Sequence, residues 1–130
     1  MANKAESLIP FFRPKSIAII GVSRKPRKIG HEILHNLKLS GFQGDIFSIN
    51  PNTSSVLGLK TYKTISDVKR EIDLAIIAIP AASVTDALEQ CAKAGVKAAI
   101  IITSGFGEAG KIDLEKRLVD IASPAGMRLM

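Results

Sequence analysis

Residues 16–30 read SIAIIGVSRKPRKIG and combine a strand, a loop and the start of a helix. The apolar run that follows Ser16 is typical of a strand buried on both faces. Gly21 then permits a tight turn, and Ile29, Ile33, Leu34 and Leu37 are spaced as on one face of a helix, whose first amide groups point back at the loop. The loop between them carries four cations: Arg24, Lys25, Arg27 and Lys28. This arrangement predicts binding of an anionic ligand.

Buried strands and amphipathic helices alternate along the rest of the chain. Further strands are predicted at residues 45–49, 58–62, 73–79, 98–103 and 127–130. Helices are predicted at residues 29–39, 83–94 and 112–122, with a brief helical segment opening at Ser66. The second of these helices is expected to begin at Ser83, because Ser83 and Asp86 have the spacing of a capping box. The alternation predicts an α/β fold, a Rossmann-like doubly wound parallel sheet of strand order 3-2-1-4-5-6 with a truncated last strand.

Polar residues and turn signals follow the carboxyl ends of these strands. In an open α/β sheet the ligand binds where the strand order reverses, which here lies between the first strand and the strand at 73–79. Ser23, Asn50, Pro80 and Thr103 all face this position in the expected fold. The loops 21–28, 50–53, 80–84 and 103–106 are therefore expected to form one site.

The composition indicates one globular domain, residues 1–130, with an excess of positive charge. Of the 130 residues 46% are apolar, enough for a buried core, and the net charge is +6. Only 5% are aromatic, too few for a surface that stacks on bases, so no nucleic-acid partner is expected. The apolar run at residues 73–82 is interrupted by Pro80 and is too short to span a bilayer, so no membrane partner is expected. The single cysteine and the lack of a visible signal peptide favour the cytoplasm.

Neither the histidines nor the cysteine is predicted to be catalytic or to bind a metal. His31 and His35 have metal-ligand spacing on the first helix, but no further ligand completes a set, so a surface or packing position is expected. Cys91 lies within a helix with nothing near it in sequence to lower its pKa, so a packed thiol is expected.

Two features argue against NAD as the ligand. Gly21 is followed by glycine only at Gly30, so the closely spaced glycines that bring backbone against a pyrophosphate are missing. The second strand ends at Ile49 and Asn50, without the acidic residue that binds the ribose hydroxyls of NAD. The loop cations instead suit a ligand that carries both a ribose phosphate and a pyrophosphate, which leaves NADP and coenzyme A open.

Several separated motifs together resemble one protein family. They are FFRPKSIAIIGVS at 11–23, GFQGDIFSINPN at 41–52, LGLKTY at 57–62, DLAIIAIPA at 73–81 and GVKAAIIITSGFGE at 95–108. Over residues 8–130 the chain resembles the coenzyme A-binding domain of NDP-forming (ADP-forming) acyl-CoA synthetases, such as the acetate–CoA ligase alpha subunit. That domain is related to the amino-terminal part of the succinyl-CoA synthetase alpha subunit. The resemblance implies coenzyme A, or acyl-CoA, as the ligand.

The resemblance also implies how each loop contacts the coenzyme. The phosphates and adenosine would lie against Gly21, Val22, Ser23, Arg24, Lys25 and Lys28. The adenosine side would be flanked by Asn50, Pro51 and Asn52, of which Asn52 departs from the lysine common near this position. The pantetheine path would be lined by Ile79, Pro80 and Ala81. Its inner end, near the thiol, would be held by Ile102, Thr103, Ser104 and Gly105.

The resemblance further implies an enzyme of which this chain is one part. In the family, acyl-CoA and phosphate give an acyl phosphate, whose phosphoryl group passes to a histidine and then to ADP. That histidine and the ATP-grasp region lie in other domains or subunits, so residues 1–130 are expected to hold no catalytic residue and to be the N-terminal part of a longer subunit. One alternative is a coenzyme A- or acetyl-CoA-sensing module of a protein acetyltransferase, or a stand-alone coenzyme A-binding protein. Another, less favoured, is an NADP-dependent oxidoreductase.

Overall fold

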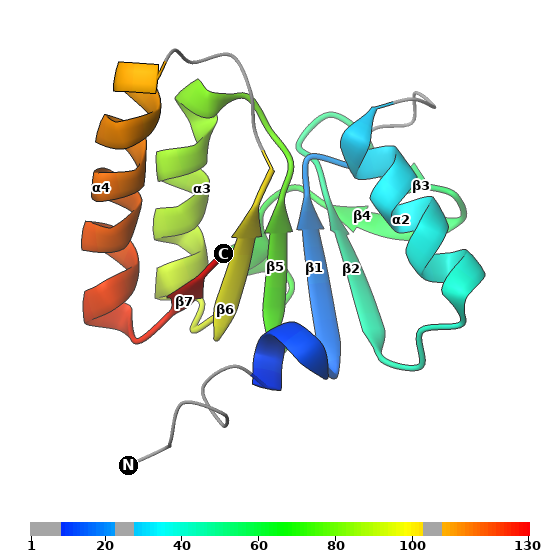
Figure 1. Ribbon diagram of the computed structural model, residues 1–130. Coiled ribbons are helices and arrows are strands. Elements are labelled where there is room, and N and C mark those ends of the chain that lie inside the picture. Colours follow the sequence, from blue (N-terminus) through cyan, green and yellow to red (C-terminus); the bar gives the residue numbers. More distant parts are fainter. Residues whose placement is uncertain (1–8, 23–27, 103–107) are drawn as a thin grey trace.

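A computed structural model of the chain describes residues 9–22, 28–102 and 108–130, with backbone alone at 108–111. Within these ranges seven strands form one sheet, in the order β3-β4-β2-β1-β5-β6-β7 (Figure 1). The strands are β1 (Ser16–Ile20), β2 (Asp45–Ile49), β3 (Ser55–Val56), β4 (Leu59–Tyr62), β5 (Leu74–Ile77), β6 (Ala98–Ile101) and β7 (Arg128–Leu129). The helices are α2 (Ile29–Ser40), the 3-10 helix η1 (Ile65–Asp67), α3 (Ala81–Lys93) and α4 (Glu108–Ala125).

The predicted doubly wound sheet is confirmed. Every strand pairing is parallel except that of β3 with β4, and the order of the six predicted strands is the expected one. The addition is β3, which forms a hairpin with β4 at the edge of the sheet. Leu57 and Gly58 make its two-residue turn, both with positive φ (51° and 77°), as a hairpin turn of this length requires. A two-residue strand has no periodicity to detect, so the sequence did not predict it.

Successive residues of the central strands point to opposite faces, and both faces are apolar. Ala75 and Ile77 of β5 belong to the core cluster under α3 and α4, whereas Leu74 and Ile76 belong to the cluster under α2. This is why these segments read as continuous hydrophobic runs rather than alternating ones. Figure 1 shows the two layers, with α3 and α4 on one face of the sheet and α2 on the other.

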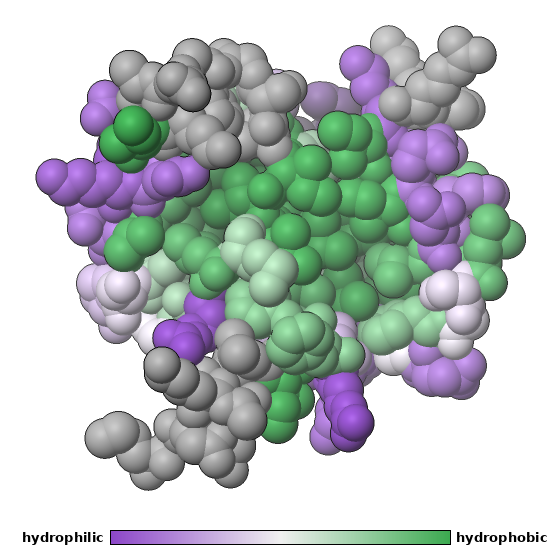
Figure 2. All heavy atoms as spheres, in the orientation of Figure 1, coloured by the Kyte–Doolittle hydropathy of each residue, from purple (hydrophilic) through white to green (hydrophobic). Residues whose placement is uncertain are grey.

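The face that carries α2 is only partly covered by helix. Figure 2 shows apolar side chains gathered over the middle of this face. Helix α2 packs on β1, whereas Ile100 and Ile102, at the carboxyl end of β6, remain partly exposed on the same face. Among the described residues, no other helix longer than one turn covers this part of the sheet.

Two helices begin earlier than their sequence signals indicated. Helix α3 starts at Ala81 with Pro80 as its N-cap, so the expected capping box at Ser83 is wrong. The amide of Ser83 already donates to the Pro80 carbonyl oxygen at 2.9 Å, which places Ser83 within the first turn. Helix α4 begins at Glu108 rather than at residue 112 and continues through Pro124 to Ala125.

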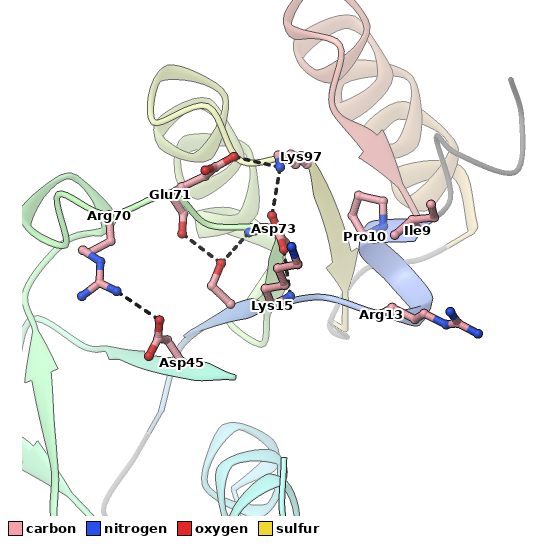
Figure 3. Close-up of a pocket in the computed structure, with 10 residues that line it drawn as sticks. Ile9, Pro10, Arg13, Lys15, Asp45, Arg70, Glu71, Asp73 and Lys97 are labelled. Carbon is pink, nitrogen blue, oxygen red and sulfur yellow. Dashed lines mark hydrogen bonds and ion pairs between the residues drawn. The ribbon is translucent and has the colours of Figure 1, made fainter. Parts of the chain in front are cut away.

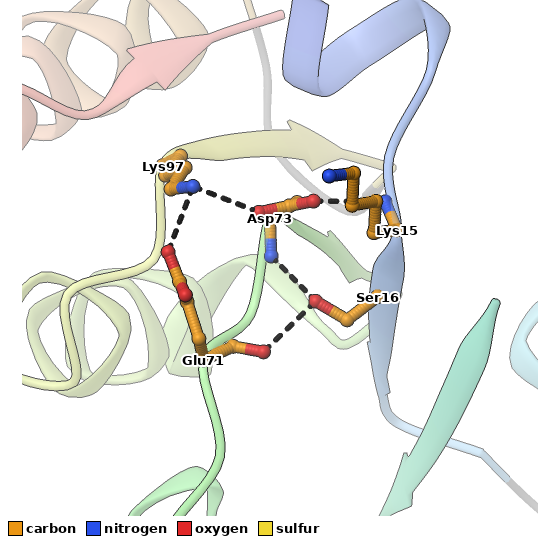
Figure 4. Close-up of polar contacts among 5 residues, drawn as sticks. All are labelled: Lys15, Ser16, Glu71, Asp73 and Lys97. Carbon is orange, nitrogen blue, oxygen red and sulfur yellow. Dashed lines mark hydrogen bonds and ion pairs between the residues drawn. The ribbon is translucent and has the colours of Figure 1, made fainter.

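A polar network joins the amino ends of β1, β5 and β6 (Figure 4). The Ser16 hydroxyl donates to the Glu71 carbonyl oxygen and accepts the Asp73 amide, both at 2.9 Å. The Asp73 carboxylate accepts the Lys15 amide at 2.8 Å and pairs with the Lys97 ammonium at 3.1 Å. Lys97 also pairs with the Glu71 carboxylate at 2.8 Å. The network therefore fixes the start of β1 against the starts of its neighbours.

The same residues line a hollow of about 610 Å³ at the amino-terminal edge of the sheet (Figure 3). A further ion pair, between Arg70 and Asp45 at 3.1 Å, borders it. The three carboxylates of this hollow, those of Asp45, Glu71 and Asp73, are thus all paired with cations of the hollow itself.

Two opposing effects set the pKa of Asp73. Partial burial acts to raise this pKa, but the hydrogen bond from the Lys15 amide and the ion pair with Lys97 outweigh burial and leave the pKa below its ordinary value. Because the folded-state pKa is depressed, the ionised carboxylate stabilises the fold above the ordinary pKa of an aspartate. This contribution is lost as the pH falls through the folded-state value.

We expect Asp73→Asn to lower the free energy of unfolding by about 1 to 2 kcal/mol at pH 7, because the amide cannot form the ion pair with Lys97. Urea unfolding at pH 7 and at pH 3 measures the effect, and the difference from wild type should shrink at pH 3, because below the ordinary pKa of an aspartate the unfolded chain takes up a proton at Asp73. Asp120→Asn, at an exposed position of α4, is the control. A difference that is the same at both pH values would contradict the stabilising effect of the charge.

Candidate functional site

Backbone hydrogen bonds continue past the strand ends and align the loops of the carboxyl-terminal edge. The Asn50 amide donates to the Tyr62 carbonyl oxygen at 2.9 Å, and the Gly21 amide donates to that of Ile49 at 3.0 Å. On the other side of β1, the amide of Ala78 donates to the Ile20 carbonyl oxygen at 2.9 Å. The segments that leave β4, β2, β1 and β5 therefore lie side by side at the position where the strand order reverses.

Helices α2, α3 and α4 all begin at this edge, because each follows a parallel strand (Figure 1). The first amide groups of a helix lack partners within the helix and carry a partial positive charge. Lys28, the exposed N-cap of α2, adds a full positive charge beside one of these helix ends. The edge as a whole therefore favours an anionic ligand.

Two glycines allow β1 to pass closely under α2 and beside the loop after β5. A Cβ atom on Gly30, in the first turn of α2, would lie 2.3 Å from the Gly21 carbonyl oxygen. A Cβ atom on Gly21 would lie 2.2 Å from the Ala78 carbonyl oxygen, and the φ of Gly21 is +100°. Gly30 thus allows the close helix–strand packing for which dinucleotide-binding loops use the last of their three glycines. The wide spacing of Gly21 and Gly30 in the sequence did not predict this equivalence.

The side chain of Asn50 joins two of the loops. Its Nδ2 donates to the carbonyl oxygen of Val22, and its Oδ1 accepts the Asn52 amide at 2.8 Å, which forms an Asx turn. Asn50 therefore holds the loops after β1 and β2 in place. We infer that it acts by positioning them, in addition to any contact with a ligand.

A hollow of about 480 Å³ lies between these loops, within the usual range for small-molecule sites. Its walls come from the ends of β1 and β2, the segment after β4, the loop after β5, and α3. The lining residues are Ile20, Gly21, Ile49, Asn50, Pro51, Asn52, Lys63, Thr64, Ile65, Ile79, Pro80, Ser83, Asp86, Ala87 and Gln90.

Six residues predicted from the sequence line this hollow: Gly21, Asn50, Pro51, Asn52, Ile79 and Pro80. Four others do not. Val22 is fully buried, Lys28 caps α2, Ala81 packs against the core at the start of α3, and Ile102 packs on the face that carries α2. Ser23, Arg24, Lys25, Thr103, Ser104 and Gly105 lie outside the described residues.

The charged lining residues of the hollow, Lys63 and Asp86, were not predicted from the sequence. Lys63 follows β4 directly, and Asp86 lies on α3, where its carboxylate accepts a hydrogen bond from Gln90 at 3.3 Å. In the sequence, Lys63 is marked only by its position directly after a short predicted strand. Lys63 reaches the site because that strand, β4, pairs with β2.

The histidines and the cysteine occupy the kind of position expected. His31 is buried, His35 is exposed, and the described residues contain no group of three or more side chains able to hold a metal ion. Cys91 is fully buried in the core under α3, and burial raises its pKa to about 12. In the part of the chain that the structure describes, no helix has the length and apolar character that crossing a membrane needs.

The sequence profile described as "CoA binding domain" matches residues 15–130, nearly the whole chain. The chain belongs to the CoA binding domain family.

Individual relatives agree with this assignment. ADP-forming acetate–CoA ligase II of Archaeoglobus fulgidus is 45% identical over 120 residues, which are 91% of this chain and 18% of that protein. The alpha subunit of ADP-forming acetate–CoA ligase II of Pyrococcus furiosus is 43% identical over 92% of this chain and 26% of that subunit. The solved apo form of the dinucleotide forming acetyl-coenzyme A synthetase 1 of Ca. Korarchaeum cryptofilum superposes with a TM-score of 0.89 at 45% identity, over 95% of this chain and 27% of that one. This CoA binding domain therefore spans about a quarter or less of the length of these relatives.

We expect Gly30→Ala to lower the free energy of unfolding by about 1 to 3 kcal/mol, because the added Cβ displaces the Gly21 backbone. The sign of this change in the free energy of unfolding is diagnostic, because an alanine that fits within a helix would instead stabilise it by up to about 1 kcal/mol relative to glycine. Asn36→Ala, at an exposed position of α2, is the control and should be neutral or slightly stabilising. Chemical denaturation measures both variants, and a more stable Gly30→Ala would contradict the close contact.

We expect the Cys91 thiol to resist a disulfide-exchange reagent such as Ellman's reagent at pH 8, since it is buried and protonated there. The unfolded chain in guanidinium chloride should react completely. Rapid reaction of the folded protein would show that the thiol is accessible.

Proposed function

We propose that this CoA binding domain supplies the coenzyme A site of an ADP-forming acyl-CoA synthetase. The observation that carries the proposal is the likeness, over more than nine-tenths of the chain, to proteins named ADP-forming acetate–CoA ligases and to a solved acetyl-coenzyme A synthetase. The geometry supports it, because the hollow lies at the reversal of strand order and is lined by Pro80 and Ser83, at the start of α3, and by Gly21, which lies against the first turn of α2.

In this proposal each loop meets a different part of the coenzyme. The pyrophosphate lies at the start of α2, against Gly21–Ser23 with Arg24, Lys25 and Lys28. The adenosine lies beyond β2, beside Pro51 and Asn52, in a turn that Asn50 fixes. The pantetheine passes Ile79 and Pro80, with Ala81 behind them, toward the loop after β6. Ile102, Thr103, Ser104 and Gly105 hold its thiol end.

The chemistry takes place outside this chain. The proposed overall reaction converts acyl-CoA, ADP and phosphate into a carboxylic acid, coenzyme A and ATP. Other domains or subunits provide the phosphorylated histidine and the ATP-grasp site. The role of this chain is to hold coenzyme A so that its thioester or free thiol faces those domains. We place the assembly in the cytoplasm.

Two observations support partner domains of this kind. The relatives are several times longer than the region that matches this chain. In addition, the apolar sheet face beside α2 leaves Ile100 and Ile102 partly exposed, as a surface that packs against further protein would be.

We expect the isolated chain to bind coenzyme A more tightly than NADP in calorimetric titrations at low salt, where charge contacts are least screened. Replacing both Lys25 and Lys28 with alanine should weaken coenzyme A binding by about tenfold or more, because two cations are removed beside the phosphates. The control replaces Lys116 and Arg117, two exposed cations of α4, and should leave the affinity nearly unchanged.

Tighter binding of NADP than of coenzyme A would contradict the proposal and favour an oxidoreductase. Equal loss of affinity in the two double variants would show that overall charge, rather than the loop, attracts the ligand.

A further inference from the structure

Lys63 occupies a fixed place at the rim of the hollow. The residue before it, Tyr62, accepts the Asn50 amide, which ties the end of β4 to the end of β2. The residue after it, Thr64, forms a capping box with Asp67: the Thr64 hydroxyl and amide lie 3.1 and 3.3 Å from the Asp67 carboxylate. The backbone of Lys63 is therefore held on both sides, and only its flexible side chain is left to adapt to a ligand.

The side chain of Lys63 lines the hollow, and the structure gives it no other partner. Among the described residues Lys63 forms no ion pair, whereas Lys97 forms two. Lys60, within β4, lies over the Tyr62 ring at 4.9 Å from its centroid and does not line the hollow. Among the described lining residues, Lys63 is thus the only one with a positive charge. The neighbouring turn after β2 contributes only the uncharged Asn50, Pro51 and Asn52.

The order of the strands determines which phosphate Lys63 can reach. In a doubly wound sheet the pyrophosphate of a nucleotide lies at the helix after the first strand, and the ribose lies beyond the carboxyl end of the second. Lys63 follows β4, which pairs with β2 on the side away from β1. It is therefore placed on the ribose side of the site rather than beside the pyrophosphate.

We propose that Lys63 binds the phosphate on the ribose of coenzyme A and selects the coenzyme from analogues that lack this group. The inference rests on the proposed coenzyme A site and goes beyond it by assigning one phosphate to one side chain. A ribose monophosphate is a near-dianion on an exposed part of the ligand, and a lysine beside it contributes a charge-assisted hydrogen bond. The contact is partly open to solvent, so its effect is moderate.

The test compares coenzyme A with dephospho-coenzyme A, which lacks this phosphate, in calorimetric titrations of the whole chain. We expect Lys63→Ala to weaken coenzyme A binding by about five- to tenfold and to change binding of dephospho-coenzyme A by less than about twofold. Lys60→Ala removes the same charge three residues earlier, within β4, and should leave both affinities nearly unchanged. Lys63→Arg should retain most of the preference for coenzyme A. Thermal unfolding of each variant checks that the exposed substitutions leave the fold intact.

The outcomes are distinct. If Lys63→Ala weakens both ligands equally, Lys63 contacts the pyrophosphate or acts through general charge, and the assignment is overturned. If Lys63→Ala binds coenzyme A as wild type does, the assignment is also overturned, while the proposed function stands. If wild type binds neither ligand, the proposed function fails, and the assignment falls with it.

Discussion

The backbone contact between Gly30 and Gly21 is the constraint on which the site depends. Because neither residue has a side chain, the first turn of α2 lies directly against the backbone that follows β1. The backbone of Gly21 also passes close to the Ala78 carbonyl group, in the loop after β5. A larger residue at either position would push α2 or the loop after β5 outward. Gly21 itself lines the hollow, so the close packing at these two glycines fixes the position of one of its walls.

Strand pairing links the position of β1 to the positions of the other loops. Parallel pairing fixes Ile20 opposite Ile49 and Ile77, so displacement of β1 would displace the ends of β2 and β5 as well. At the opposite edge, Asp73, Ser16 and Lys97 hold the starts of the same strands. The central strands are therefore fixed at both ends, and the side chain of Asn50 adds a link between the loops that they support.

Most of the fold could be predicted from the sequence, because buried parallel strands are unbroken apolar runs and their order follows from right-handed crossovers. The loops of the site could be predicted for the same reason, since carboxyl ends of parallel strands share one edge. What could not be predicted depends on contacts between distant segments. Lys63 reaches the hollow only through the pairing of β4 with β2, and Asn50 has its positioning role only because Val22 lies beside it. The start of α3 was misjudged because Ser83 had the local signal of a cap, whereas Pro80 occupies that position.

The two edges of the sheet differ in how their charged side chains are paired. At the amino-terminal edge, Asp45, Glu71 and Asp73 are paired with Arg70 and Lys97, so that hollow is largely neutralised by its own side chains. At the carboxyl-terminal edge, the described lining of the hollow carries one cation, Lys63, and one carboxylate, Asp86, which accepts a hydrogen bond from Gln90. Among the described residues neither of these two forms an ion pair, and α2 and α3 begin at this edge with amino-terminal ends that carry partial positive charge. In the proposed function, the phosphates of coenzyme A meet Lys63 and these helix ends, whereas the side chains of the other edge are paired with one another.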